Sequence, residues 1–125
     1  MILVDTSIWV DHLASSNEGL ARLLDDGAVL AHPFVIGELA LGNLRRRDLV
    51  IGLLQDLPQA VLATDAEVLR FIEGLALYGL GIGYVDAHLL AAVRLTPGSA
   101  LWTSDRRLFT VAESLALAWP SQAPL

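Results

Sequence analysis

Short apolar runs alternate along the chain with longer segments in which apolar residues recur at helical spacing. Runs of three or four apolar residues next to polar or turn residues are typical of buried strands, whereas apolar residues at every third or fourth position are typical of helices. The expected strands are 2–4, 28–31, 60–63 and 100–103, with an added edge strand at 115–119, and the expected helices are 8–13, 18–24, 34–41, 45–57, 64–78, 85–95 and 105–115.

Strands that alternate with helices predict a parallel sheet covered on both faces. We therefore expect residues 1–125 to form a single three-layer α/β/α domain with a central parallel sheet of four or five strands. The sequence has no linker, internal repeat or low-complexity segment. A chain of this length is large enough to bury one hydrophobic core.

The apolar content of 54 % exceeds the usual share of about 45–50 %, although the usual share includes glycine. A small domain has little interior, so we expect part of this apolar surface to contact a partner, as in an oligomer. The absence of cysteine excludes disulfides and thiolate metal sites. Residues 1–5 lack the basic start of a signal peptide, and the charge-free run 74–85 is short of the roughly 20 residues that cross a bilayer. We expect a soluble, cytoplasmic protein.

The formal net charge is −6, from 8 basic and 14 acidic residues, and every basic residue is arginine. Such a chain is a poor non-specific binder of nucleic acid, because phosphate contacts need cations. However, carboxylates that hold divalent cations are neutralised in the working site although they count as negative in this sum.

Four acidic residues lie where an α/β fold gathers ligands. Asp5 and Asp105 follow the ends of expected strands, and ligand sites lie outside the carboxyl ends of parallel strands. Asp86 lies in the first turn of a helix that follows a glycine-rich break, and Glu38 lies within a helix among apolar residues. Each aspartate alone has a structural explanation as a helix cap or as an acid that favours a helix start. Together, the four acids indicate one site.

Several carboxylates at one point repel each other unless a cation neutralises them. Mg²⁺ and Mn²⁺ prefer oxygen ligands, and such ions promote the hydrolysis of phosphodiesters. The hydroxyls of Thr6, Ser7 and Thr103 are expected to orient these acids through hydrogen bonds. The acids therefore predict a metal-dependent hydrolase.

The motifs around the acids resemble those of a known family. They are Asp5-Thr6-Ser7, Ile36-Gly37-Glu38-Leu39, the run from Val85 to Ala92 around Asp86, and the run from Thr103 to Leu108 around Asp105. In these motifs the chain resembles the PIN domain, and their order and spacing further resemble the VapC toxins of bacterial VapBC toxin–antitoxin pairs. The likeness extends over the whole chain.

The resemblance implies a Mg²⁺- or Mn²⁺-dependent endoribonuclease, usually a homodimer, that is inhibited by a VapB-type antitoxin protein. It makes Asp5 and Asp86 the first choices as metal ligands, with Glu38 and Asp105 completing the catalytic cluster, and gives Asp11 a supporting role.

Arg106 and Arg107 border the acidic site and are the expected RNA contacts. The cluster 45–47 is expected to be a solvated helix start, and the three histidines lack metal-ligand spacing. Trp9 and Trp102 are expected to be core or dimer-interface residues rather than platforms for base stacking.

Two other enzyme classes are excluded because the sequence contains no lysine. They are the receiver-type phosphoacceptor domains and the haloacid-dehalogenase-type phosphatases, both of which need one. Two alternatives remain open. One is a non-catalytic PIN-like module that binds RNA or protein, and the other is a nuclease that acts on DNA.

Overall fold

The computed structural model describes residues 1–120, and the last five residues of the expected domain lie outside this part. Three parallel strands form its sheet, in the order β2-β1-β3. Their bounds are Ile2–Val4 for β1, Val29–Leu30 for β2 and Ala100–Trp102 for β3. The central strand β1 is buried along its whole length, which explains its unbroken apolar sequence.

The sheet corrects the expected number of four or five strands. Segments 60–63 and 115–119 do not form strands. The chain pairs with the sheet edges only through isolated bridges, Ala31–Gln59 directly before the first segment and Leu101–Ala118 within the second. Ala60 N still donates to Ala31 O at 2.9 Å. The segment then leaves the sheet edge, because Val61 N donates to the Thr96 side chain at 2.9 Å instead of to a strand.

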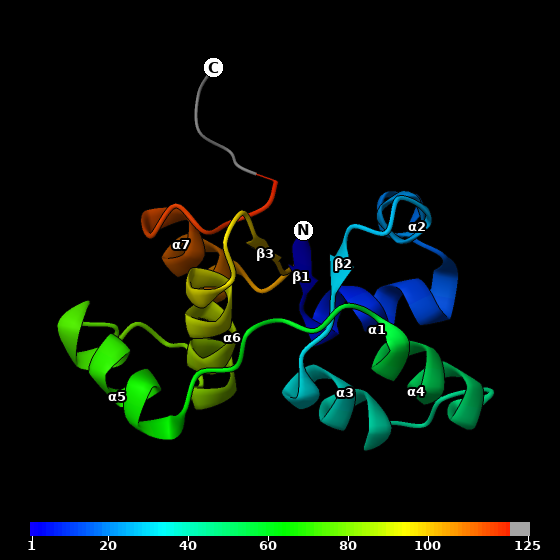
Figure 1. The fold of residues 1–125 in the computed structure, drawn as a ribbon, viewed down its shortest axis with the longest axis horizontal. Helices are drawn as coiled ribbons and strands as arrows, with labels where there is room; N and C mark the ends of the chain where they lie inside the picture. Colours follow the sequence, from blue (N-terminus) through cyan, green and yellow to red (C-terminus); the bar gives the residue numbers. More distant parts are fainter. Residues whose placement is uncertain (121–125) are drawn as a thin grey trace.

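Seven helices surround the sheet in the described residues. In Figure 1, α1 to α4 lie on the β2 side of the strands and α5 to α7 lie on the β3 side. The expected α/β/α fold class is confirmed. The bounds are α1 (Thr6–Ser15), α2 (Glu18–Asp25), α3 (Pro33–Ala40), α4 (Arg47–Asp56), α5 (Asp65–Gly74), α6 (Tyr84–Leu95) and α7 (Arg106–Ser114).

Two expected helix boundaries are wrong by a few residues. Helix α5 ends at Gly74 rather than near residue 78. Ala76, just beyond it, has a positive φ of 51°, which is incompatible with a right-handed helix. Helix α4 begins at Arg47 rather than at residue 45, because Arg46 has the left-handed φ of 51°.

The core holds α6 firmly against the sheet. Residues 87–93 of α6 are all buried, and α6 contacts β3 directly. This packing fixes the first turn of α6, which carries Asp86, relative to the strands. Among residues 1–120, no helix is long and apolar enough to cross a membrane. The largest fully buried core residues include Leu3, Leu20, Leu39, Leu89, Leu90, Leu101 and Leu108.

Candidate active site

Asp5 comes directly after β1 and caps α1. Its side chain is almost fully buried, at 8 % exposure. Oδ1 accepts a hydrogen bond of 2.8 Å from Thr6 N, while Oδ2 accepts from Ser7 Oγ at 3.0 Å and from Thr103 Oγ1 at 2.7 Å. Three donors therefore fix the orientation of this carboxylate.

The hydroxyl of Thr103 links Asp105 to Asp5, because it donates a hydrogen bond to the Asp5 carboxylate and accepts one from the Asp105 backbone. Thr103 follows β3, the strand beside β1, and its Oγ1 accepts a hydrogen bond of 3.1 Å from Asp105 N. Ser104 N donates to Ser7 Oγ at 3.2 Å. Asp105 caps α7 with Oδ1, which accepts from Leu108 N at 2.9 Å. The two aspartates thus occupy the same end of neighbouring strands.

Asp86 is half-buried in the first turn of α6, where its Oδ2 accepts a hydrogen bond of 2.9 Å from Gly83 N. Burial raises the pKa of Asp86, and the charges of Asp5, Asp105 and Glu38 raise it further, against the opposing effect of the Gly83 N–H. The four acids therefore share one electrostatic environment, although they lie far apart in the sequence.

Glu38 is exposed on α3, while its neighbours Val35 and Leu39 point into the core. Its Oε1 accepts a hydrogen bond of 2.7 Å from Thr6 Oγ1, and Thr6 follows Asp5 directly. Its carboxylate is therefore not buried, although the apolar residues on either side of it in the sequence suggest burial. The hydrogen bond ties it to the start of α1.

The donor set consists of carboxylate and hydroxyl oxygens, which suits a hard divalent cation. Within residues 1–120, no three His, Asp or Glu side chains are close enough to hold an ion by themselves. Asp86, Asp105 and Glu38 each use one carboxylate oxygen in the hydrogen bonds above and keep the other without one in the described residues. This arrangement fits a hydrated ion such as Mg²⁺, which keeps several waters and takes few protein ligands.

The structural explanations for the aspartates are also correct. Asp5 and Asp105 are helix caps, and Asp86 accepts a hydrogen bond at the start of α6. These hydrogen bonds use one or both oxygens of each carboxylate, and they place the three carboxylates at the N-termini of α1, α7 and α6. Asp11 is exposed on α1.

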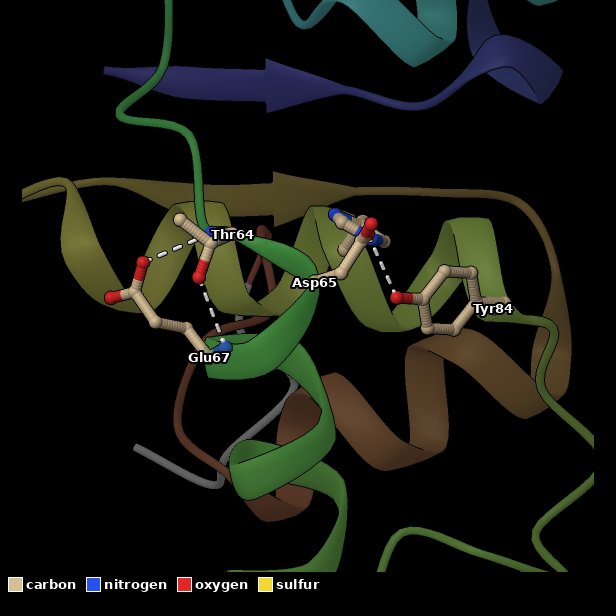
Figure 2. Close-up of polar contacts among 5 residues, drawn as sticks. Thr64, Asp65, Glu67 and Tyr84 are labelled. Atoms are coloured by element: carbon tan, nitrogen blue, oxygen red, sulfur yellow. Dashed lines mark hydrogen bonds and ion pairs between the residues drawn. The ribbon is translucent and has the colours of Figure 1, made fainter.

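A buried histidine connects the helices that carry Glu38 and Asp86. His88 on α6 is 3 % exposed, and its Nε2 lies 3.1 Å from Oδ1 of Asp65 at the start of α5. Tyr84 OH donates to the same oxygen at 3.0 Å, as Figure 2 shows. The rings of Phe34 on α3 and Tyr84 on α6 each lie 4.7 Å from the His88 ring.

The role of Asp65 was missed in the sequence. The only signal there was the helix start, since Thr64 and Glu67 form a capping box of reciprocal hydrogen bonds that places Asp65 in the first turn (Figure 2). A capping box predicts a helix N-terminus but not the partner of the acid within it.

His32 is a second buried histidine, and it caps α3 through Nδ1, which accepts from Phe34 N at 3.0 Å. Its Nε2 has no hydrogen-bond partner within the described residues. Burial and, to a smaller extent, the neighbouring His88 lower the pKa of His32 to about 4. The imidazole is therefore neutral at neutral pH.

The arginines beside the site differ in their surroundings. Arg107 lies across Gly81, where an added Cβ would be 2.7 Å from its Cδ and Nη1. Arg106 instead lines a hollow beside Thr103 and Ser104. In the 45–47 cluster, all three arginines are exposed and Arg47 donates to Ala40 O at 2.9 Å, in agreement with a solvated helix start.

The tryptophans also differ. Trp9 is buried in the core. Trp102 is only half-buried and packs edge to face against Trp119, with the ring centroids 4.9 Å apart.

Comparison with known proteins places these features in a family context. The sequence model of one family, the PIN domain, matches residues 2–114, a range that contains all four acids. Two proteins named ribonuclease VapC32, from Mycobacterium tuberculosis strains CDC 1551 / Oshkosh and ATCC 25618 / H37Rv, are each 49% identical to this chain over 108 residues. The alignment covers 86% of this chain and 87% of each relative.

Proposed function

This chain belongs to the PIN-domain family, and we propose that it is a metal-dependent endoribonuclease that hydrolyses RNA phosphodiester bonds as the toxin of a toxin–antitoxin pair. One observation carries the proposal: the carboxylate of Asp86 on α6 interacts electrostatically with Asp5 and Asp105, which follow β1 and β3, and with Glu38 on α3. The names of the two relatives, both ribonucleases, support RNA as the substrate.

We assign Asp5 and Asp86 as the principal ligands of a Mg²⁺ or Mn²⁺ ion, with Glu38 and Asp105 completing the site. A divalent ion bound there supplies an activated water and stabilises negative charge on the attacked phosphate. Burial raises the pKa of Asp86 most, and both burial and the added repulsion from Asp5, Asp105 and Glu38 are electrostatic reasons for a cation at this position.

The remaining polar groups hold the acids in place. Ser7 and Thr103 donate to Asp5, Thr6 donates to Glu38, and the Gly83 N–H donates to Asp86. Such hydrogen bonds orient ligand oxygens and hold them ready for an ion. Neutralising the cluster also lets an RNA phosphate approach a chain whose net charge is −6.

We further propose that the protein acts as a homodimer in the cytoplasm and is inhibited by a VapB-type antitoxin. Large exposed apolar side chains support contact with a protein partner, such as Leu69 at 57% and Tyr78 at 64% exposure on or just beyond α5. An antitoxin that places an arginine or lysine among the four acids would neutralise them in place of the metal. Expression without the antitoxin is then expected to be toxic.

Cleavage assays with purified protein test the enzymatic proposal. RNA and DNA of matched sequence are incubated with Mg²⁺, Mn²⁺ or EDTA, in parallel with the Asp5→Asn variant. We expect RNA cleavage that needs metal and that Asp5→Asn abolishes. Cleavage of DNA alone would favour the DNA-directed nuclease, and binding of RNA without cleavage would favour the non-catalytic module.

A further inference from the structure

An open hollow of about 570 Å³ adjoins the acidic site between the end of β3 and α7. Its lining includes the aromatic residues Trp102, Phe109 and Trp119, together with Arg106. We infer that this hollow binds one nucleotide of the RNA substrate next to the cleaved phosphate, with its base against the aromatic rings and its phosphate near Arg106. The inference rests on the proposed function, and it gives Trp102 the base-stacking role that was not expected from the sequence.

The hollow and the acids share a wall. Thr103 and Ser104 line the hollow, and the same two residues connect to the site. Thr103 Oγ1 donates to Asp5 at 2.7 Å, and Ser104 N donates to Ser7 Oγ at 3.2 Å. An RNA whose phosphate lies at the acids therefore has its neighbouring nucleotide at the entrance of this hollow.

The aromatic lining suits an unpaired base. Trp102 and Trp119 meet edge to face, with an interplanar angle of 66°, and neither ring is fully buried. Phe109 is half-buried as well. Single-stranded RNA is commonly recognised by stacking unpaired bases on aromatic side chains, which requires no positive charge. This mode of binding suits a protein with a net charge of −6.

The size and charge of the hollow favour a single nucleotide. Its volume falls within the range of roughly 300–1,000 Å³ that is usual for small-ligand sites. Arg106 lies in the first turn of α7 and can contact one phosphate. Glu113 also lines the hollow, and its carboxylate does not favour a phosphate-rich ligand. Arg107 does not line it, so the structure distinguishes between the two arginines expected to contact RNA.

Tryptophan fluorescence tests the inference without depending on catalysis. A short single-stranded RNA of mixed sequence is titrated into the full chain, once in EDTA and once in Ca²⁺. We expect the RNA to quench the fluorescence. Trp102→Leu removes the flat ring and is expected to weaken RNA binding about 10-fold or more, whereas Trp102→Phe keeps a ring and is expected to bind within about 3-fold of the unaltered chain. If Trp102→Leu does not fold, Phe109→Leu replaces it in the experiment and is likewise expected to weaken RNA binding about 10-fold or more.

Arginine variants test the phosphate contact. Arg106→Ala is expected to weaken RNA binding and to reduce the slope of log Kd against log salt by about 0.7, the value for one lost phosphate contact on a single strand. Arg70→Ala, a matched exposed arginine on α5, is expected to change neither quantity.

The outcomes separate this inference from the proposed function. RNA cleavage by the unaltered chain without quenching, and with unchanged KM in Trp102→Leu and Arg106→Ala, would overturn the nucleotide site and leave the nuclease intact. Quenching that depends on Arg106 in a protein that cleaves nothing would support the site and overturn the nuclease. Fluorescence that changes with protein concentration but not with RNA would show that a second copy fills the hollow, and would overturn the inference.

Discussion

Thr103 donates a hydrogen bond of 2.7 Å from Oγ1 to Oδ2 of Asp5, although 98 positions separate the two residues in the chain. The contact follows from the sheet register. Val4 on β1 pairs with Trp102 on the parallel strand β3, so the next residue of each strand leaves the sheet at the same level. The first acid is therefore oriented by a residue from the opposite end of the sequence.

Replacement of Thr103 by valine removes this hydrogen bond while keeping the shape of the side chain. Thr103 is buried and also accepts from Asp105 N, so the change leaves polar groups unsatisfied, and we expect unfolding to become easier by about 2 kcal/mol. Metal affinity should fall roughly 10-fold or more because Asp5 loses a group that orients it. Urea unfolding and metal titration measure the two effects.

The matched control for this variant is Thr110→Val, since Thr110 is exposed and its hydroxyl donates only to Arg106 O. It should cost less than about 0.5 kcal/mol and leave metal binding unchanged. Equal effects of the two variants would show that the Thr103–Asp5 contact has no special role.

Asp86→Asn is expected to stabilise the metal-free protein and to abolish RNA cleavage. The change removes a charge that three other acids repel, while the amide oxygen of asparagine can still accept from Gly83 N. Because the pKa of Asp86 is raised in the folded chain, its charged form destabilises the fold at pH values above that pKa. This destabilisation disappears as the pH falls through the pKa and the carboxylate becomes protonated. The gain in melting temperature over the unaltered chain should therefore be present at neutral pH in EDTA and shrink in acid.

Glu73→Gln is the control for Asp86→Asn, because Glu73 is an exposed acid on α5 and does not contribute to the pKa shift of Asp86. It should leave the melting temperature nearly unchanged. If Asp86→Asn lowers the melting temperature in EDTA at neutral pH, the four carboxylates do not repel one another as described.

His32 is expected to make the protein less stable in mild acid. Its pKa is about 4 in the folded chain and about 6.5 when unfolded, so between these values the unfolded chain binds the extra proton. The free energy of unfolding should fall by roughly 2–3 kcal/mol as the pH drops from 6.5 to 4 on account of this residue. His32→Asn, which can still cap α3 but does not titrate, should show a shallower decrease. Identical pH profiles for the two proteins would contradict this reading of His32.

Gly81→Ala and Gly79→Ala form a matched pair in the loop before Asp86. Both glycines have positive φ, 81° and 74°, so both substitutions strain the backbone. Only at Gly81 does an added Cβ also meet Arg107, and nothing lies within 4 Å at Gly79. Because the end of the Arg107 side chain is flexible and exposed, Gly81→Ala should cost only about 0.5 kcal/mol more in unfolding free energy. The difference should vanish when Arg107→Ala is added, and a difference that persists would mean that Arg107 does not lie against this loop.

The sequence predicted the positions of the acids in the fold better than it predicted the number of strands; their roles stay a prediction. Asp5 and Asp105 could be found because each follows an apolar strand, and parallel strands end at one edge of a sheet. Segments 60–63 and 115–119 have equally apolar sequences, yet the first forms no bridge beyond the one at Gln59 directly before it, and the second forms only the bridge at Ala118. A segment forms a strand only if its backbone keeps hydrogen bonding along the sheet edge. The tertiary packing decides this, and the composition of the segment does not predict it.

The directions of individual side chains also could not be predicted from the sequence. Arg106 and Arg107 are identical neighbours and both line a hollow beside Leu80, but only Arg106 also lines the hollow beside Thr103, and Arg107 lies against Gly81. The pairing of His88 with Asp65 depends on how α5 packs on α6. These relationships come from the tertiary packing of helices, which single-residue patterns do not specify.

The central claim is that Asp5, Glu38, Asp86 and Asp105 form one site for a divalent cation. Paramagnetic Mn²⁺, added in amounts well below one ion per chain while the NMR signals of the backbone amides are recorded, tests this claim most directly. We expect the amides of residues 5–7, 38–39, 85–87 and 103–106 to broaden first and together, and Asp86→Asn to prevent it. First broadening at remote acids such as Asp25, Asp26 and Asp56, with these four segments unaffected, would contradict the account.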